Sequence, residues 1–182
     1  DATVQHDDRG SDLSAAADAT VAELCNLPWP IVAVLPGAET GVELADRLAV
    51  RLGTRNNGEE MSEARRNKYI MGETVRAAGV RAVQQKRATE WADIESFLRE
   101  WTPDPFIVVV KPIQSAGSDD VFKCTSVEEV RTAFDKINGR CNMLGVLNEG
   151  VLVQEFLDGT EYVIDSVSRD GVHKVTAIWE YD

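Results

Sequence analysis

The chain has 182 residues and a formal net charge of −12, with 43% hydrophobic and 27% charged residues. This composition predicts a globular chain of one or two domains, and the acidity argues against nonspecific binding to nucleic acid or to an anionic membrane. No apolar run approaches the length of a membrane span, so we expect no membrane partner and a cytoplasmic location. The three cysteines are far apart in the sequence, which favours neither a zinc site nor a disulfide framework.

The first 60 residues read as helix, strand and helix. An Ala-rich stretch ending at Cys25 predicts a helix that Ser11 or Asp12 caps. The apolar residues 31–35 predict a short buried strand, and the leucines of residues 42–52 recur at helical spacing. This order is typical of one β-loop-α unit of a Rossmann-like layer. The connecting loop lacks a full Gly-x-Gly-x-x-Gly, which argues against a dinucleotide site.

The next segment predicts a helix, a strand and a second helix. Ser62 is the expected cap of a helix that Gly79 ends, and residues 80–85 read as an alternating strand. Trp91, Ile94, Leu98 and Trp101 recur at helical spacing, so residues 91–101 should form an amphipathic helix.

A lysine follows the most apolar run of the chain. Residues 106–110 predict a buried strand that ends at Lys111, a loop of small residues continues to Ser118, and residues 121–124 resume as a strand. Backbone N–H groups of such a loop, together with one cation, suit a phosphate. An ordinary hairpin would have the same pattern, so both interpretations stay open at this point.

The last third of the chain is rich in strand signals. Ser126 and Glu129 form a capping box for a helix that Asn138-Gly139 ends. Residues 151–155 predict a strand, and two alternating segments around Asp170-Gly171 predict a hairpin. The predicted class is therefore α+β (α/β), with a small sheet backed by helices and the start of a second antiparallel sheet.

Four stretches together carry a family resemblance. They are "IVAVLPGAETGVELADRLAVRLG", "RRNKYIMGETVRAAGV", "VVVKPIQSAGSDDV" and "VLVQEFLDGTEYVIDSV". In this order they resemble the corresponding segments of ATP-grasp enzymes. Within that family they are most similar to the carboxylate–amine (amino-acid) ligases that have a preceding Rossmann-like domain. The resemblance implies that residues 1–60 end this preceding domain, residues 61–150 form the ATP-grasp small lobe, and residues 151–182 begin the large lobe.

The resemblance also implies a nucleotide site. Lys68 and Lys111 would contact the phosphates, although the spacing of Lys68 alone favours a solvated helix residue. The other implied contacts are Ser115, Ala116, Gly117 and Ser118 over the β- and γ-phosphates, Glu155, Phe156 and Leu157 at the adenine, and Glu161 at the ribose. The loop has one glycine, fewer than the glycine-richest family members. Glu39 is a candidate for the acceptor-substrate pocket. For Phe156 and Leu157, packing in the hydrophobic core is the alternative to adenine binding.

The implied reaction is ATP-dependent ligation, in which a carboxylate is activated as an acylphosphate and then joined to an amine. The partners would be ATP, Mg²⁺ and the two small-molecule substrates, while a homodimer is one assembly that the sequence leaves open. We expect the magnesium ligands beyond residue 182, so that the chain is a fragment and inactive alone. A noncatalytic nucleotide-binding or regulatory module and a purely structural domain are the alternatives.

Overall fold

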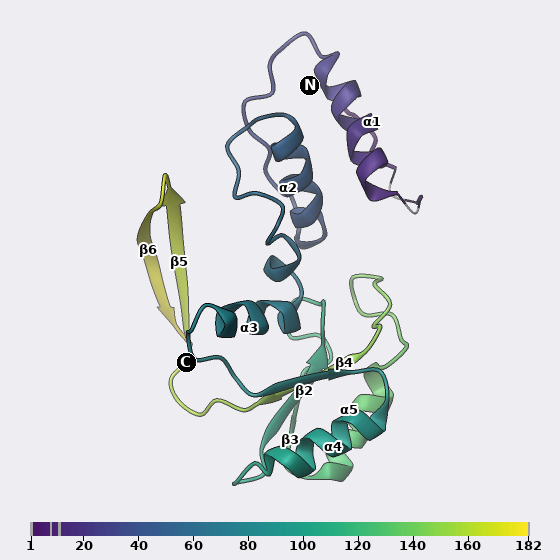
Figure 1. The fold of residues 1–182 in the computed structure, drawn as a ribbon, viewed down its shortest axis with the longest axis vertical. Coiled ribbons are helices and arrows are strands. Elements are labelled where there is room, and N and C mark those ends of the chain that lie inside the picture. Colours follow the sequence, from purple (N-terminus) through teal and green to yellow (C-terminus); the bar gives the residue numbers. More distant parts are fainter. Residues whose placement is uncertain (1, 8, 11, 182) are drawn as a thin grey trace.

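The chain combines helices with antiparallel strands, which confirms the predicted α+β class (Figure 1). The structure is a computed structural model, and it describes residues 2–7, 9–10 and 12–181. The helices are α1 (Leu13–Cys25), α2 (Val42–Arg51), α3 (Lys68–Ala77), α4 (Trp91–Trp101) and α5 (Val127–Ile137), with short 3-10 turns η1 (Glu39–Gly41) and η2 (Glu63–Arg65). None of the described helices has the length and apolar character that crossing a membrane requires.

The main sheet has four antiparallel strands in the order β1-β4-β2-β3. The strands are β1 (Gln85–Ala88), β2 (Val108–Pro112), β3 (Phe122–Cys124) and β4 (Val151–Glu155). Val109 lies opposite both Lys123 and Gln154. Because side chains alternate along a strand, these residues share one face with Lys111. Strands β5 (Tyr162–Arg169) and β6 (Val172–Glu180) form a separate hairpin that projects from the main sheet in Figure 1.

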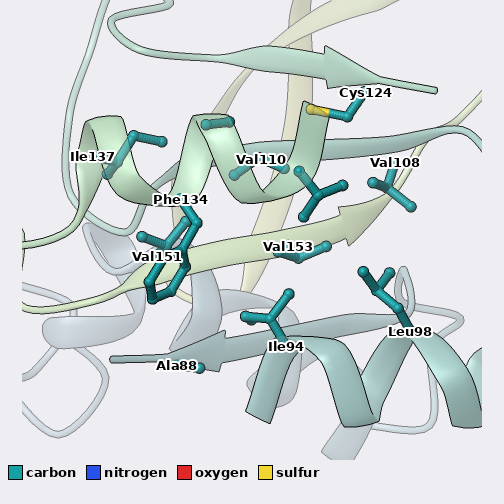
Figure 2. Packing of buried hydrophobic residues seen from close by; sticks show 12 residues of the cluster. Ala88, Ile94, Leu98, Val108, Val110, Cys124, Phe134, Ile137, Val151 and Val153 are labelled. Atoms are coloured by element: carbon teal, nitrogen blue, oxygen red, sulfur yellow. The ribbon is translucent and has the colours of Figure 1, made fainter. Parts of the chain in front are cut away.

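The hydrophobic core lies between the opposite face of this sheet and helices α4 and α5 (Figure 2). Val108, Val110 and Val153 point into it from the strands and are fully buried. Ile94 and Phe134 meet them from the two helices. The helical spacing in residues 91–101 therefore identified the buried face of α4 correctly.

Helix α3 covers the other face of the sheet, where Lys111 lies (Figure 1). The side-chain amide of Gln85 on β1 donates to the Tyr69 carbonyl at 2.9 Å and to Glu73 at 2.7 Å. Gln154 on β4 donates to the Gln85 side-chain oxygen at 2.7 Å. This buried polar chain fixes α3 against the strands, and thereby places the first residue of α3, Lys68, near the end of β2.

The predicted cap at Ser62 is wrong. The Ser62 hydroxyl donates instead to Asp46 at 2.6 Å, and no side-chain cap bond starts from it. Asn67 is the cap, because its side-chain oxygen accepts from the backbone N–H groups of Tyr69 and Ile70. The predicted helix is consequently divided into η2 and α3.

Two predicted strands also differ from the structure. The strand expected at residues 80–85 lies at Gln85–Ala88, because these are the residues that pair with Val151–Gln154 of β4. Residues 31–35 form no strand, and Val32 and Leu35 are 81% and 84% exposed. No strand among the described residues pairs with this segment, so its backbone has no ladder to join. Asp12 caps α1, whereas Ser11 lies outside the described residues.

The three thiols should react at very different rates. Burial raises the pKa of Cys124 to about 11, and the nearby Glu129 carboxylate adds to this effect. Cys25 and Cys141 are exposed. Because the thiolate is the reactive form, we expect a disulfide reagent at mildly alkaline pH to modify two of the three thiols in the folded chain. The third should react only after unfolding, and rapid reaction of all three in the folded chain would contradict the burial of Cys124.

Candidate functional site

A pocket of about 200 Å³ forms where α3, the end of β2 and the following loop meet. Its lining residues are Lys68, Lys111, Pro112, Ser115, Ala116, Gly117, Ser118, Asp119 and Val121. All six residues predicted to contact phosphates are therefore brought together. We call residues 114–119 the phosphate loop, after the role that the sequence analysis predicts for them.

Both lysines of the pocket are half-buried cations. The Lys68 ammonium donates to the Ser115 carbonyl at 2.7 Å, and the Lys68 backbone N–H donates to the Ile113 carbonyl at 3.1 Å. Burial lowers the pKa of Lys111, and the neighbouring charge of Lys68 lowers it further. Burial also lowers the pKa of Lys68, as does the Arg66 guanidinium, while Glu39 opposes them. A bound polyanion would compensate both ammonium groups.

The phosphate loop turns sharply beside these lysines. Gly117 has φ +62° and Ser118 has φ +59°, both in the left-handed region that favours glycine. The Ser115 hydroxyl donates to Asp119 at 2.9 Å, which closes the loop on itself. With only small side chains at positions 115–118, a ligand can approach the backbone closely.

A second pocket, of about 420 Å³, lies at the end of β4. Its lining residues are Trp101, Pro103, Asp104, Pro105, Ile107, Lys123, Glu155, Phe156 and Asp158. The Lys123 ammonium lies 3.9 Å from the centre of the Phe156 ring, a cation–π contact. Glu155 accepts from Arg81 at 2.6 Å and from the Gln84 backbone N–H at 3.1 Å. Its carboxylate therefore fixes the segment before β1 to the end of β4.

Three predicted site residues line neither pocket. Leu157 is 57% exposed, and the Glu161 carbonyl accepts from the Tyr181 backbone N–H at 3.1 Å at the base of the hairpin. Glu39 pairs with Arg66, whose side chain is only 11% exposed. The Glu39 carboxylate, which the sequence suggested for the acceptor-substrate pocket, therefore connects η1 to Arg66 just before α3.

Lys123 and Asp119 are two of the pocket residues that sequence reasoning missed. Lys123 lies between Phe122 and Cys124, and the alternation of β3 could have placed it on the face of Lys111. Asp119 has no comparable signal, because one of its two hydrogen-bond partners, Met143, is 24 residues away in the sequence.

The chain is similar to known proteins in sequence and in fold. Residues 104–182 match the ATP-grasp domain family. Dapdiamide A synthase from Enterobacter agglomerans is 39% identical over 155 residues, which cover 84% of this chain and 36% of the relative. Alanine–anticapsin ligase from Bacillus subtilis strain 168 is 29% identical over 135 residues, which cover 67% of this chain and 28% of the relative.

The fold is also similar to a crystal structure of L-amino acid ligase from Bacillus licheniformis. The TM-score is 0.67 at 20% sequence identity, and the match covers 93% of this chain and 37% of that chain. The chain spans about a third of the length of the relatives that it matches. The sequence resemblance to ATP-grasp enzymes is thereby confirmed, and residues 104–182 of the chain belong to the ATP-grasp domain family.

Proposed function

We propose that this chain forms the ATP-binding part of a ligase that joins a carboxylate to an amine. The observation that carries the proposal is the convergence of Lys68, Lys111 and the phosphate loop on one pocket. The two curated relatives are named as a synthase and a ligase, which supports the same class of reaction. The proposal includes the division of the chain into the end of a preceding domain (residues 1–60), the small lobe (61–150) and the start of the large lobe (151–182).

The pocket supplies what the phosphates of ATP need. Two ammonium groups balance the negative charge, and the small side chains of the phosphate loop let backbone groups approach the β- and γ-phosphates. In the proposed reaction a carboxylate oxygen of the acid attacks the γ-phosphorus, and the bond to ADP breaks. The amine then attacks the acyl carbon and displaces phosphate. Lysines that hold the terminal phosphates would favour the first step by stabilising the developing charge.

The adenosine end would lie toward the second pocket. Phe156 offers a ring face and Lys123 a cation there, and backbone groups at Glu155 and Leu157 would meet the adenine edge. Glu161 is the proposed partner of the ribose hydroxyls, because an ionised carboxylate is a strong acceptor. Glu39 would line the acceptor-substrate pocket only if it shared its carboxylate with Arg66.

Magnesium is the metal that the family typically uses with ATP, and its preferred ligands are oxygen atoms. In the part of the chain that the structure describes, no group of three or more His, Cys, Asp or Glu residues could hold a metal ion. The described residues therefore offer no such cluster of ligands for magnesium.

Calorimetric titration of the chain with ATP, ADP and GTP tests the proposal. We expect saturable binding of both adenine nucleotides and weaker binding of GTP, because the second pocket would recognise the base. Binding of none of the three would contradict a nucleotide site. Phosphate release that requires both an acid and an amine would extend the result from binding to ligation.

Binding of ATP should be accompanied by proton uptake at alkaline pH. The pKa values of Lys68 and Lys111 are lowered in the free chain, so both lysines begin to lose protons at lower pH than an ordinary lysine. Bound phosphates would raise both pKa values again. At about pH 9, calorimetry in buffers of different ionisation enthalpy should therefore report protons taken up, and the uptake should shrink toward neutral pH. The same binding enthalpy in every buffer at the higher pH would contradict this expectation.

The matched variant for this experiment is Lys111→Arg. An arginine keeps its charge throughout the range, so the variant should retain binding but take up fewer protons. Unchanged uptake in this variant would assign the effect to Lys68 or to another group.

A further inference from the structure

Residues 140–150, which we call the brace loop, are held rigid by two buried asparagines. Asn142 and Asn148 are 7% and 5% exposed. The side-chain oxygen of Asn142 accepts from the backbone N–H groups of Leu144 and Val146 at 3.0 and 3.1 Å. The side-chain amide of Asn142 also donates to the Asn148 side-chain oxygen at 3.2 Å. This segment has no helix or strand, yet its shape is fixed by internal hydrogen bonds.

The brace loop is hydrogen-bonded to the first and the last residue of the phosphate loop. The Asn142 side-chain amide donates to the Gln114 carbonyl at 2.6 Å. At the other end, the Met143 backbone N–H donates to Asp119 Oδ2 at 2.9 Å. The same oxygen accepts from the Ser115 hydroxyl at 2.9 Å. One carboxylate oxygen therefore joins the start of the phosphate loop, its end and the brace loop.

Asp119 is an unexpected residue for a pocket that would bind phosphates. It lines the same pocket as Lys68 and Lys111, and its negative charge would repel a polyphosphate. Charge complementarity therefore gives no reason for a carboxylate here. Its two hydrogen bonds do, because bonds to an ionised acceptor are stronger than those to a neutral one.

We propose that Asp119 is a positioning residue for the terminal phosphates of ATP, acting through the Ser115 hydroxyl and the Met143 backbone N–H. The inference rests on the proposed ATP site. Asp119 would hold the phosphate loop in the shape that accepts the β- and γ-phosphates, so that little ordering is left to the binding step.

The sign of one mutational effect separates this role from a plain charge effect. If Asp119 acted only through its charge, its removal would leave two lysines less opposed, and ATP would bind more tightly. If Asp119 acts as a brace, Asp119→Ala frees the loop and ATP binds more weakly. The two hydrogen bonds suggest a loss of about tenfold or more, and AMP, which lacks the β- and γ-phosphates, should be affected less than about twofold.

The neighbouring carboxylate offers a matched control. Asp120 has φ +49° and pairs with Lys136 on α5 at 3.0 Å. Asp120→Asn removes the same charge from the residue that follows the phosphate loop, and asparagine tolerates left-handed backbone. We expect it to leave ATP affinity unchanged within about twofold, because the control leaves both bonds of Asp119 in place. Asp119→Asn should fall between wild type and Asp119→Ala, since its side-chain oxygen can still accept both hydrogen bonds.

The experiment measures ATP, ADP and AMP affinities of these variants by calorimetry, and amide hydrogen exchange of the free chain. We expect Asp119→Ala to weaken ATP and ADP selectively and to speed exchange at the Met143 amide. The positioning role of Asp119 would be contradicted if Asp119→Ala bound ATP more tightly, lost as much affinity for AMP as for ATP, or left the exchange rate of the Met143 amide unchanged. Failure of the wild type to bind any adenine nucleotide would instead contradict the proposed function, whatever the exchange rates show.

Discussion

Replacing Lys111 by alanine is expected to lower the affinity for ATP by about 10- to 100-fold, the range for losing a hydrogen bond to a charged group. Lys111 lies at the end of β2, half-buried beside Lys68 and facing the phosphate loop. No other described cation lines this pocket apart from Lys68. Calorimetric titration with ATP measures the change directly.

Removing the charge of Lys111 should not unfold the chain. Burial and Lys68 hold the pKa of Lys111 below the value it has in an unfolded chain. Between these two pKa values the folded chain binds fewer protons, so the free energy of unfolding rises with pH, and below both the charged lysine lowers stability. Lys111→Met, which keeps the apolar stem, should therefore unfold at the same or a higher temperature than wild type while binding ATP weakly.

A lysine elsewhere in the same sheet serves as the control. Lys86 on β1 lies opposite Val153 and lines neither pocket. Lys86→Ala should leave ATP affinity within about twofold of wild type, because Lys86 shares the face of Val153, opposite to that of Lys111, and the effect of a distant charge is screened by salt. Equal losses in Lys86→Ala and Lys111→Ala would point to general charge attraction, and an unchanged affinity in Lys111→Ala would remove the central contact of the proposed site.

Local sequence patterns anticipated the elements whose causes are local. The run before Lys111 is apolar because β2 is a central strand, and the Ser126 hydroxyl accepts from the Glu129 backbone N–H as a capping box requires. Residues 31–35 have the same apolar character but form no strand, because a strand also needs a partner. Apolar composition alone does not show whether a neighbouring strand is present to pair with.

The site was predictable only as far as its residues belong to one motif. Lys111 and residues Ser115–Ser118 lie within one stretch of eight residues, and the structure places them in one pocket. The Asp119–Met143 bond spans 24 residues and the Arg81–Glu155 pair spans 74. Such contacts depend on the course of the chain in space. The roles of Asp119 and Arg81 therefore became visible only with the fold.

Gly150→Ala is expected to give the largest loss of stability, about 2–4 kcal/mol of the free energy of unfolding, from backbone strain and local overpacking together. Gly150 is buried, joins the brace loop to β4 and has φ +125°, a region that residues with a Cβ rarely adopt. An added Cβ would lie 3.1 Å from the Ala88 carbonyl oxygen and 3.5 Å from Ile113 Cδ1. The Ala88 oxygen is a backbone atom of β1 and cannot give way without displacing that strand, whereas the Ile113 contact is an ordinary van der Waals distance to a side chain. Urea denaturation followed by circular dichroism measures the loss.

Gly159 separates the two causes, because it shares the backbone strain but not the crowding. Its φ is +140°, and an added Cβ would meet nothing within 4 Å. Gly159→Ala should therefore cost about 1–2 kcal/mol at most, the share that belongs to backbone strain alone. Equal losses in the two variants would show that the approach to Ala88 contributes nothing. A larger loss in Gly150→Ala would instead show that the close contact between β1 and the start of β4 requires a glycine, at the point where the brace loop enters the sheet.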